Sequence, residues 1–283
     1  MFNQENFKKI KSRVVKAVTE LYNTAIENQK YQNDIVLFYS DAHYDSTLPE
    51  NCNKFIVGTG IEGIDDYPRI HFLIDFMRSR KEKDMSFSPG QGKIQKYKKY
   101  TINLELMMYT HLWEAERSLT LLKQLSNLIQ NKPYQWDINI PLVTQQNFIR
   151  NEIEQIFLDH NLDAGKIIQE SYHSHLKNAF LHGNYTFNKS GYIKLNNYRD
   201  TDCKYNAISF DKWEKKFLNS VLLHFEILFQ KRQRLIKFGS HNSEVIVWLP
   251  KNNGTEYYND VLKWSDLRKE YIWKRKHKYW RQK

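Results

Sequence analysis

Apolar residues recur at intervals of three and four along much of the chain, and this spacing places them on one face of an α-helix. The pattern predicts helices over residues 4–28, 69–83, 102–129, 145–158, 164–182 and 211–236. The longest apolar stripe runs through residues 102–129, and Pro133 lies just beyond its end. The chain is therefore expected to be mainly helical.

Stretches of strand-forming residues are short and few. They cover residues 35–39, 54–57, 185–187, 192–195 and 245–249. The stretches 185–187 and 192–195 flank the turn sequence Asn-Lys-Ser-Gly and predict a small β-hairpin. The predicted fold class is mainly α: a helical bundle with a small β-hairpin and an N-terminal α/β segment.

One stretch has the composition of a linker. Residues 84–92 contain a proline and two glycines, which favour turns over helix or strand. This predicts three consecutive parts: an N-terminal α/β segment (1–95) of undefined role, a helical domain (96–240), and a C-terminal strand followed by a basic, aromatic tail (241–283).

Several reactive side chains lie near the end of the helix expected over residues 164–182. On one continuous helix a polar stripe would contain Ser171, His175, Asn178 and His182. Two imidazoles and an amide at a helix end are able to bind a phosphate and to move protons at neutral pH. Spacing alone favours a simpler interpretation, in which the histidine interacts with the helix dipole and Gly183 ends the helix.

The nine residues from Lys177 to Tyr185, KNAFLHGNY, resemble the signature of the HEPN superfamily of small helical domains. That signature is an arginine and a histidine separated by four to six residues. The similarity extends over residues 100–238. It implies either a metal-independent ribonuclease that acts as a toxin or in abortive-infection or antiviral defence, or a non-catalytic module that binds RNA or a nucleotide.

The resemblance also implies roles for individual side chains. His182 would act as the general acid or base, Lys177 would stabilise charge on the phosphate, and Asn178 would orient the imidazole or bind a phosphate oxygen. His175 would be a second proton carrier, and Tyr185 would position the substrate or the helix end. The chain departs from the family at Lys177, because lysine offers a single charge where arginine offers a planar fork of donors.

The spacing of Lys177 and His182 bears on oligomeric state. Five residues of ideal helix place the two side chains about 140° apart around the helix axis. The family resolves this mismatch with a two-fold dimer whose cleft combines both copies. The resemblance therefore implies a homodimer acting on RNA, and a toxin of this kind is also compatible with a regulatory protein partner.

The charge of the chain favours polyanionic partners. Its formal net charge is +11, and residues 263–283 contain nine Lys and Arg against two acidic residues. Aromatic residues alternate with these cations, as in proteins that bind single-stranded nucleic acid. The predicted contacts are Lys274, Arg275, Lys276, Lys278 and Arg281. The alternative is an amphipathic C-terminal helix whose rings dock on the body of the protein.

Two other patterns suggest different chemistry. Residues 58–63 match the dinucleotide-binding pattern GxGxxG, but Pro68 falls where the phosphate-binding helix should continue. Asp41, His43 and Asp45 follow a predicted strand and would suit a carboxylate-metal nuclease. Aspartate and histidine are also common in solvated turns, so the sequence predicts neither a cofactor nor a metal.

Similar ambiguity applies to the polar residues that interrupt the long helix. His111, Glu114 and Arg117 lie three residues apart, which allows ion pairs on a wet face or a cleft against the motif helix.

The sequence has few signs of export or membrane insertion. It contains only two cysteines, no apolar leader at its start and no apolar run of membrane-spanning length. These features predict a cytoplasmic protein that does not enter a membrane.

Overall fold

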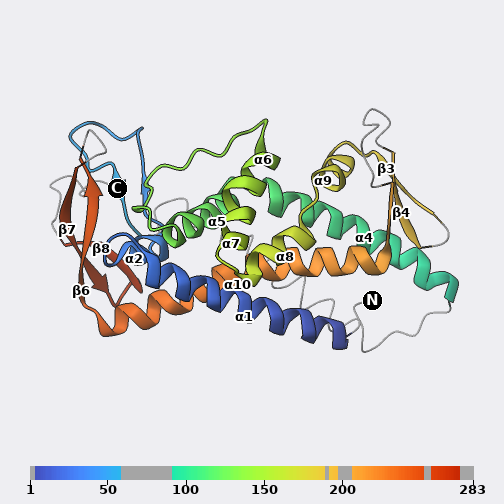
Figure 1. Cartoon of the computed structure of the whole chain (residues 1–283), viewed down its shortest axis with the longest axis horizontal. Helices are drawn as coiled ribbons and strands as arrows, with labels where there is room; N and C mark the ends of the chain where they lie inside the picture. The colour runs from blue at the N-terminus through green and yellow to red at the C-terminus, as the bar shows by residue number, and fades with distance from the viewer. Residues whose placement is uncertain (1–3, 59–90, 189–190, 197–205, 252–255, 275–283) are drawn as a thin grey trace. The chain divides into compact units, whose positions relative to one another are not determined.

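The computed structural model (Figure 1) describes residues 4–58, 91–188, 191–196, 206–251 and 256–274, with the backbone alone for residues 91–101. Helices cover far more of these residues than strands, and the expectation of a mainly helical fold with small antiparallel sheets is confirmed. None of the described helices combines the length and the apolar character needed to cross a membrane.

Contacts divide the chain into two units, each assembled from three separate stretches. The first unit comprises Met1–Glu20, Asp75–Leu119 and Ile140–Glu226, and the second comprises Leu21–Ile74, Thr120–Asn139 and Ile227–Lys283. This division differs from the consecutive parts 1–95, 96–240 and 241–283. Three of the boundaries fall inside helices: α1 (Gln4–Asn28), α5 (Glu116–Ile129) and α10 (Phe210–His241). A boundary inside a regular helix leaves no turn or composition signal in the sequence.

The first unit is a set of helices around an aromatic core. Besides parts of α1, α5 and α10 it contains α4 (Gln91–Glu114), α6 (Gln145–Ile149), a π-helical turn (Arg150–Glu154), α7 (Gln155–Asp159), α8 (Asp163–Ser171) and α9 (Ser174–Leu181). Two buried indoles are tied by hydrogen bonds: Trp213 Nε1 donates to Glu105 (2.8 Å) and Trp113 Nε1 donates to Ser220 (3.1 Å). These bonds satisfy polar groups that burial would otherwise leave unpaired.

A three-stranded sheet completes this unit. Strands β3 (Tyr185–Phe187) and β4 (Tyr192–Leu195) form the predicted hairpin, and β5 (Ala207–Ser209) adds a third antiparallel strand beside β4. The buried side chains of Ile193 and Ile208 are directly paired across β4 and β5. The helices expected over residues 4–28, 145–158 and 211–236 are present, whereas 69–83 lies outside the described residues.

Two predicted long helices are interrupted. The helix expected over 102–129 is α4 and α5, separated at Ala115, although the amide of Ala115 still donates to His111 O (2.9 Å). The helix expected over 164–182 is α8 and α9, separated by Tyr172 and His173, whose backbones are extended.

The second break has a tertiary cause. The buried hydroxyl of Tyr109, in α4, donates to Ser171 O and accepts from the amide of His173, both at 3.0 Å. One side chain thereby pairs two backbone groups that a continuous helix would have paired internally.

The second unit contains a helix where a strand was expected. Residues 35–39 belong to α2 (Asp34–Tyr39), in which every residue is buried. The carboxylate of Asp34 accepts from the amides of Tyr31 (3.1 Å) and Tyr134 (3.3 Å). A short apolar run buried on all sides has no periodicity to separate helix from strand, which explains the wrong assignment.

Two antiparallel sheets belong to this unit. The first pairs β1 (His43–Tyr44) with β2 (Phe55–Ile56), and the second has the order β6 (Glu244–Pro250), β7 (Tyr257–Ser265), β8 (Glu270–Trp273). The strands expected at 54–57 and 245–249 are therefore confirmed. The amphipathic C-terminal helix considered as an alternative is wrong for residues 263–273, because these residues belong to β7 and β8 or to the turn between them. The aromatic side chains of this segment do pack against the protein, since Trp264 and Tyr271 are buried.

Replacing Gly239 of α10 by alanine is expected to destabilise the protein. A Cβ at this position would lie 2.2 Å from Cε3 of Trp264 on β7. The clash should cost about 1–3 kcal/mol, the range for overpacking, and outweigh alanine's advantage of about 1 kcal/mol in a helix. Urea denaturation of Gly239→Ala against Ser240→Ala, an exposed neighbour, measures it. Equal midpoints would show that Trp264 does not pack here.

Candidate functional site

The end of α9 has the geometry that its sequence predicts. His182 follows the last helical residue, and its amide donates to Asn178 O (3.1 Å). Gly183 has φ +65°, in the left-handed region that glycine adopts without steric cost, and the amide of Asn184 then returns to Ala179 O (2.7 Å). Asn178 and His182 are both exposed. The helix end therefore presents an amide and an imidazole to solvent.

Lys177 points the other way. Its side chain is buried, with 6% of the residue exposed, and its ammonium donates to Gln145 Oε1 (2.9 Å) and forms an ion pair with Glu114. The structure thus places Lys177 inside the first unit and His182 on its surface. The phosphate-binding role expected of Lys177 conflicts with this geometry, because its ammonium is buried and held by Glu114 and Gln145.

The polar stripe expected on one helix is divided by the break after α8. Ser171 is buried in α8, where its hydroxyl donates to Ile167 O (2.6 Å). His175, Asn178 and His182 remain on α9 or its C-terminal end. The four-residue stripe is therefore wrong, because the extended residues between the helices change the direction of the chain.

Tyr185 holds the helix end rather than facing solvent. Its hydroxyl donates to Asn103 of α4 (2.9 Å), and its ring packs edge-on against Phe180 of α9 with centroids 5.2 Å apart. Of the two roles expected from the sequence, this position supports the one at the helix end.

The break between α8 and α9 brings together two imidazoles that the sequence did not predict to be neighbours. The rings of His173 and His175 lie with centroids 5.7 Å apart. On an uninterrupted helix, two side chains two residues apart are rotated by about 200° around the helix axis and so lie on opposite faces. No pattern in the sequence therefore predicted this pair. Only knowledge of the extended conformation at His173 would have revealed it.

Burial and positive neighbours keep His173 neutral. Burial, with a smaller contribution from the charges of Lys216, His175 and Arg150, lowers the pKa of His173 to about 4. A neutral imidazole at pH 7 is able to accept a proton.

The cations beside His173 are fixed by their own contacts. The ammonium of Lys216 donates to the backbone oxygen of Glu170, and burial lowers its pKa. Arg150 forms an ion pair with Glu154 (2.9 Å) and lies 5.9 Å from the ring centroid of Tyr172. The α8–α9 junction, defined here as Arg150, His173, His175 and Lys216, therefore combines two imidazoles with two cations.

The alternative sites have less support. Asp41 forms an ion pair with Lys231, and Asp45 is bound to Thr47 in a turn. Within the described ranges, no group of three or more His, Cys, Asp or Glu side chains is arranged to hold a metal ion. Of the glycine pattern at 58–63, only Gly58 is among the described residues.

The predicted nucleic-acid contacts of the tail fall largely outside the described residues. Lys274 follows β8 and pairs with Glu244 of β6 (2.7 Å), while Arg275, Lys276, Lys278 and Arg281 lie beyond the described chain. A truncation that tests the tail must therefore begin after Lys274, because an earlier cut would remove the ion pair of Lys274 or part of β8.

Comparison of the chain with family models, curated proteins and solved structures finds no match.

Removing the charge of Lys177 is expected to destabilise the fold. Lys177→Met would leave Glu114 and Gln145 without their partner and should cost about 1–3 kcal/mol. The double variant with Glu114→Gln should recover part of this loss, which denaturant titrations of the four proteins of the cycle measure. Independent effects of the two substitutions would contradict a structural ion pair.

Proposed function

We propose that this protein is a metal-independent RNA endonuclease, a cytoplasmic toxin or antiviral effector that a regulatory protein partner holds in check. The observation that carries the proposal is the α8–α9 junction, where a neutral imidazole, a second imidazole and two cations lie together. The resemblance of the adjoining KNAFLHGNY stretch to the HEPN signature supports the same class of chemistry.

RNA cleavage of this kind needs few protein groups, because the substrate carries its own nucleophile. His173 accepts the proton of the ribose 2′-hydroxyl while that oxygen attacks the neighbouring phosphorus. His175 donates a proton to the departing 5′-oxygen, which leaves a 2′,3′-cyclic phosphate. Arg150 and Lys216 offset the negative charge on the phosphate oxygens. A bound phosphate would also raise the pKa of His173 and make it a stronger base.

The exposed end of α9 extends this site in the proposal. Asn178 and His182 would contact the RNA strand beside the junction. Lys177 acts as a positioning residue, because its contacts with Glu114 and Gln145 fix α9 against α4 and α6.

A homodimer is also proposed, through a face of α4 and α9. Leu104 and Met107 of α4 and Leu181 of α9 are 52%, 69% and 50% exposed, and the two helices are in contact. Large exposed apolar side chains are typical of interaction surfaces, and a two-fold axis would place the same face of a second copy against them. Buried Lys177 would take no part in such an interface.

One observation favours a second candidate function. With Lys177 neutralised in an ion pair, the HEPN-like position that would stabilise charge is not available, as in a binding module that shares the fold without cutting RNA. Such a module would bind RNA or a nucleotide through its net positive charge.

Purified protein is expected to cleave single-stranded RNA in the presence of EDTA and to leave an all-deoxy strand intact. The proposed reaction consumes the 2′-hydroxyl, which DNA lacks. His182→Ala should slow cleavage about tenfold or more if this imidazole contacts the substrate, the effect of losing one hydrogen bond to a charged group. His160→Ala is the matched control, because His160 is likewise an exposed histidine directly after a helix. Binding without cleavage would support the second candidate function.

The pH dependence of cleavage should identify the base. Because the pKa of His173 is lowered to about 4 from 6.5, the imidazole stays neutral on acidification until the pH approaches the lower value. At subsaturating RNA, where the rate follows kcat/KM and reports the free enzyme, cleavage should therefore persist below pH 6, with circular dichroism confirming that the protein stays folded. His173→Asn should abolish the rate without unfolding the chain. An acid limb near pH 6.5 would assign the base to another histidine.

A further inference from the structure

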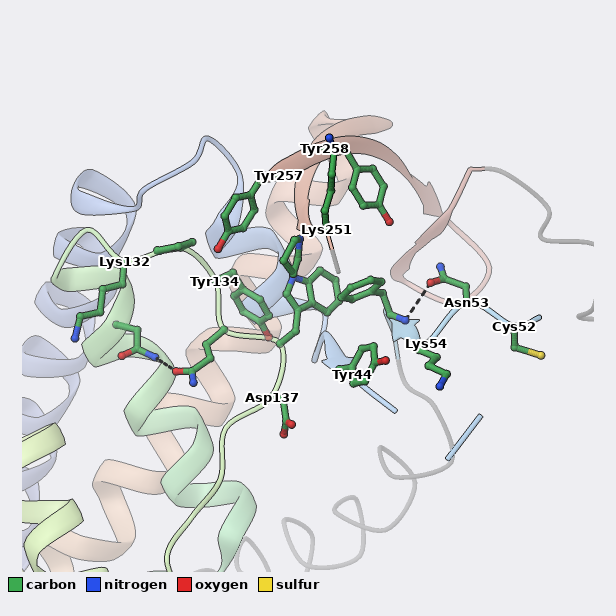
Figure 2. A pocket seen from close by; sticks show the side chains of 16 residues that line it. Tyr44, Cys52, Asn53, Lys54, Lys132, Tyr134, Asp137, Lys251, Tyr257 and Tyr258 are labelled. Carbon is green, nitrogen blue, oxygen red and sulfur yellow. Dashed lines mark hydrogen bonds between the residues drawn. The ribbon is translucent and has the colours of Figure 1, made fainter. Parts of the chain in front are cut away.

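The second unit contains a cavity of about 710 Å³ that neither the HEPN resemblance nor the α8–α9 junction involves. Its lining comes from the β1–β2 hairpin, the segment after α5, and the facing ends of β6 and β7 (Figure 2). Six aromatic side chains line it: Tyr44, Phe55, Tyr134, Trp136, Tyr257 and Tyr258. Its volume lies in the range of small-molecule and cofactor sites.

The aromatic wall is a connected set of rings. Phe55 packs edge-on against Trp136 with centroids 4.8 Å apart, Tyr44 lies 5.3 Å from Phe55, and Tyr134 lies 5.5 Å from Trp136. Tyr44 and Tyr258 are 36% and 40% exposed, so both reach solvent at the rim. Exposed rings beside a cavity offer faces on which a planar ligand is able to stack.

Hydrogen bonds to backbone oxygens hold this aromatic wall in place. The amide of Tyr44 donates to Trp136 O (2.8 Å), and the indole of Trp273 donates to Phe55 O (2.8 Å). The hydroxyl of Tyr134 donates to Ala42 O (2.6 Å). The rings are therefore ordered before a ligand arrives, which reduces the entropy lost on binding.

The polar groups of the cavity favour an anion. Lys54, Lys132 and Lys251 line it, whereas Asp137 is its only lining carboxylate within the described residues. Lys251 pairs with Glu256 (2.7 Å), which offsets part of its charge. Three amide side chains, Asn53, Asn127 and Gln135, add hydrogen-bonding groups.

One buried donor of the wall lacks an acceptor. Trp136 is 6% exposed, and its Nε1–H makes no hydrogen bond with any described residue. A buried polar group without a partner costs free energy, and a ligand acceptor beside Trp136 would remove that cost.

We propose that this cavity binds one nucleotide unit, with the base stacked on the tyrosine rings and the phosphate beside Lys54. Lys132 lies at the opposite side of the cavity (Figure 2). Rings that accept any base face, combined with cations for the phosphate, are the recurrent chemistry of single-stranded nucleic acid binding. Both a free nucleotide and a nucleotide within an RNA strand carry this chemistry. The site stands independently of the proposed endonuclease activity.

Binding is measured with two probes that the proposed ribonuclease reaction cannot consume. The first is a fluorescein-labelled 2′-O-methyl uridine decamer, followed by anisotropy, because it lacks the 2′-hydroxyl. The second is AMP, added as a competitor. The variants are Tyr44→Ala, Tyr258→Ala and Lys54→Gln. Their controls are Tyr192→Ala, a tyrosine 44% exposed outside the cavity, and Lys263→Gln, an exposed lysine of β7 that does not line it.

Each tyrosine variant should weaken binding of the decamer about fivefold or more, the lower end of the effect of losing one stacked base. Lys54→Gln should reduce the salt dependence by about 0.7 in the logarithmic slope. The controls should stay within about twofold of the natural protein. Displacement of the decamer by AMP would identify a free nucleotide as sufficient, and binding of the decamer alone would identify a strand.

The proposal is overturned if neither probe binds, or if the lining variants behave as the controls do. Loss of RNA cleavage in His173→Asn with unchanged decamer binding would separate the two proposals, because it would remove only the reaction.

Discussion

The hydroxyl of Tyr109 determines the geometry on which the candidate site depends. It bonds to Ser171 O and to the amide of His173, and so stabilises an extended backbone where the local sequence favours helix. Losing it would leave two backbone groups unpaired inside an aromatic core, at about 1–3 kcal/mol each. Because Tyr172 and His173 are extended, α9 begins in a new direction. The pairing of His173 with His175 and the burial of Lys177 both follow from that change.

The same constraint explains which parts of the structure the sequence reveals. The periodic apolar residues of α1 and α10 determine these two helices, and the turn sequence determines the β3–β4 hairpin. All three elements were therefore predictable. The breaks at Ala115 and at Tyr172 were not, because each lies within an apolar stripe that continues on both sides. α2 was missed for a related reason: its six residues are all buried, and burial on all sides removes the polar positions that define a period.

For the candidate site, the sequence suggests a segment but not the arrangement of its side chains. The glycine after His182 and the exposure of Asn178 follow from local rules for helix ends. The direction of Lys177 depends on Glu114 and Gln145, which are 63 and 32 residues away in the chain. Arg150 and Lys216 are similarly remote from His173. Long-range partners of this kind leave no mark in the spacing of a motif, so only the fold brings them together.

The surroundings of Lys177 also favour lysine over arginine at this position. A buried guanidinium carries five N–H donors in a rigid fork, whereas an ammonium carries three on a flexible stem. The described partners of Lys177 are one carboxylate and one amide oxygen, which suit the smaller group. An arginine there would bury donors that these two partners leave unpaired. The residue therefore fits an internal contact between helices, and charge stabilisation at a phosphate passes, in the proposed mechanism, to the cations beside His173.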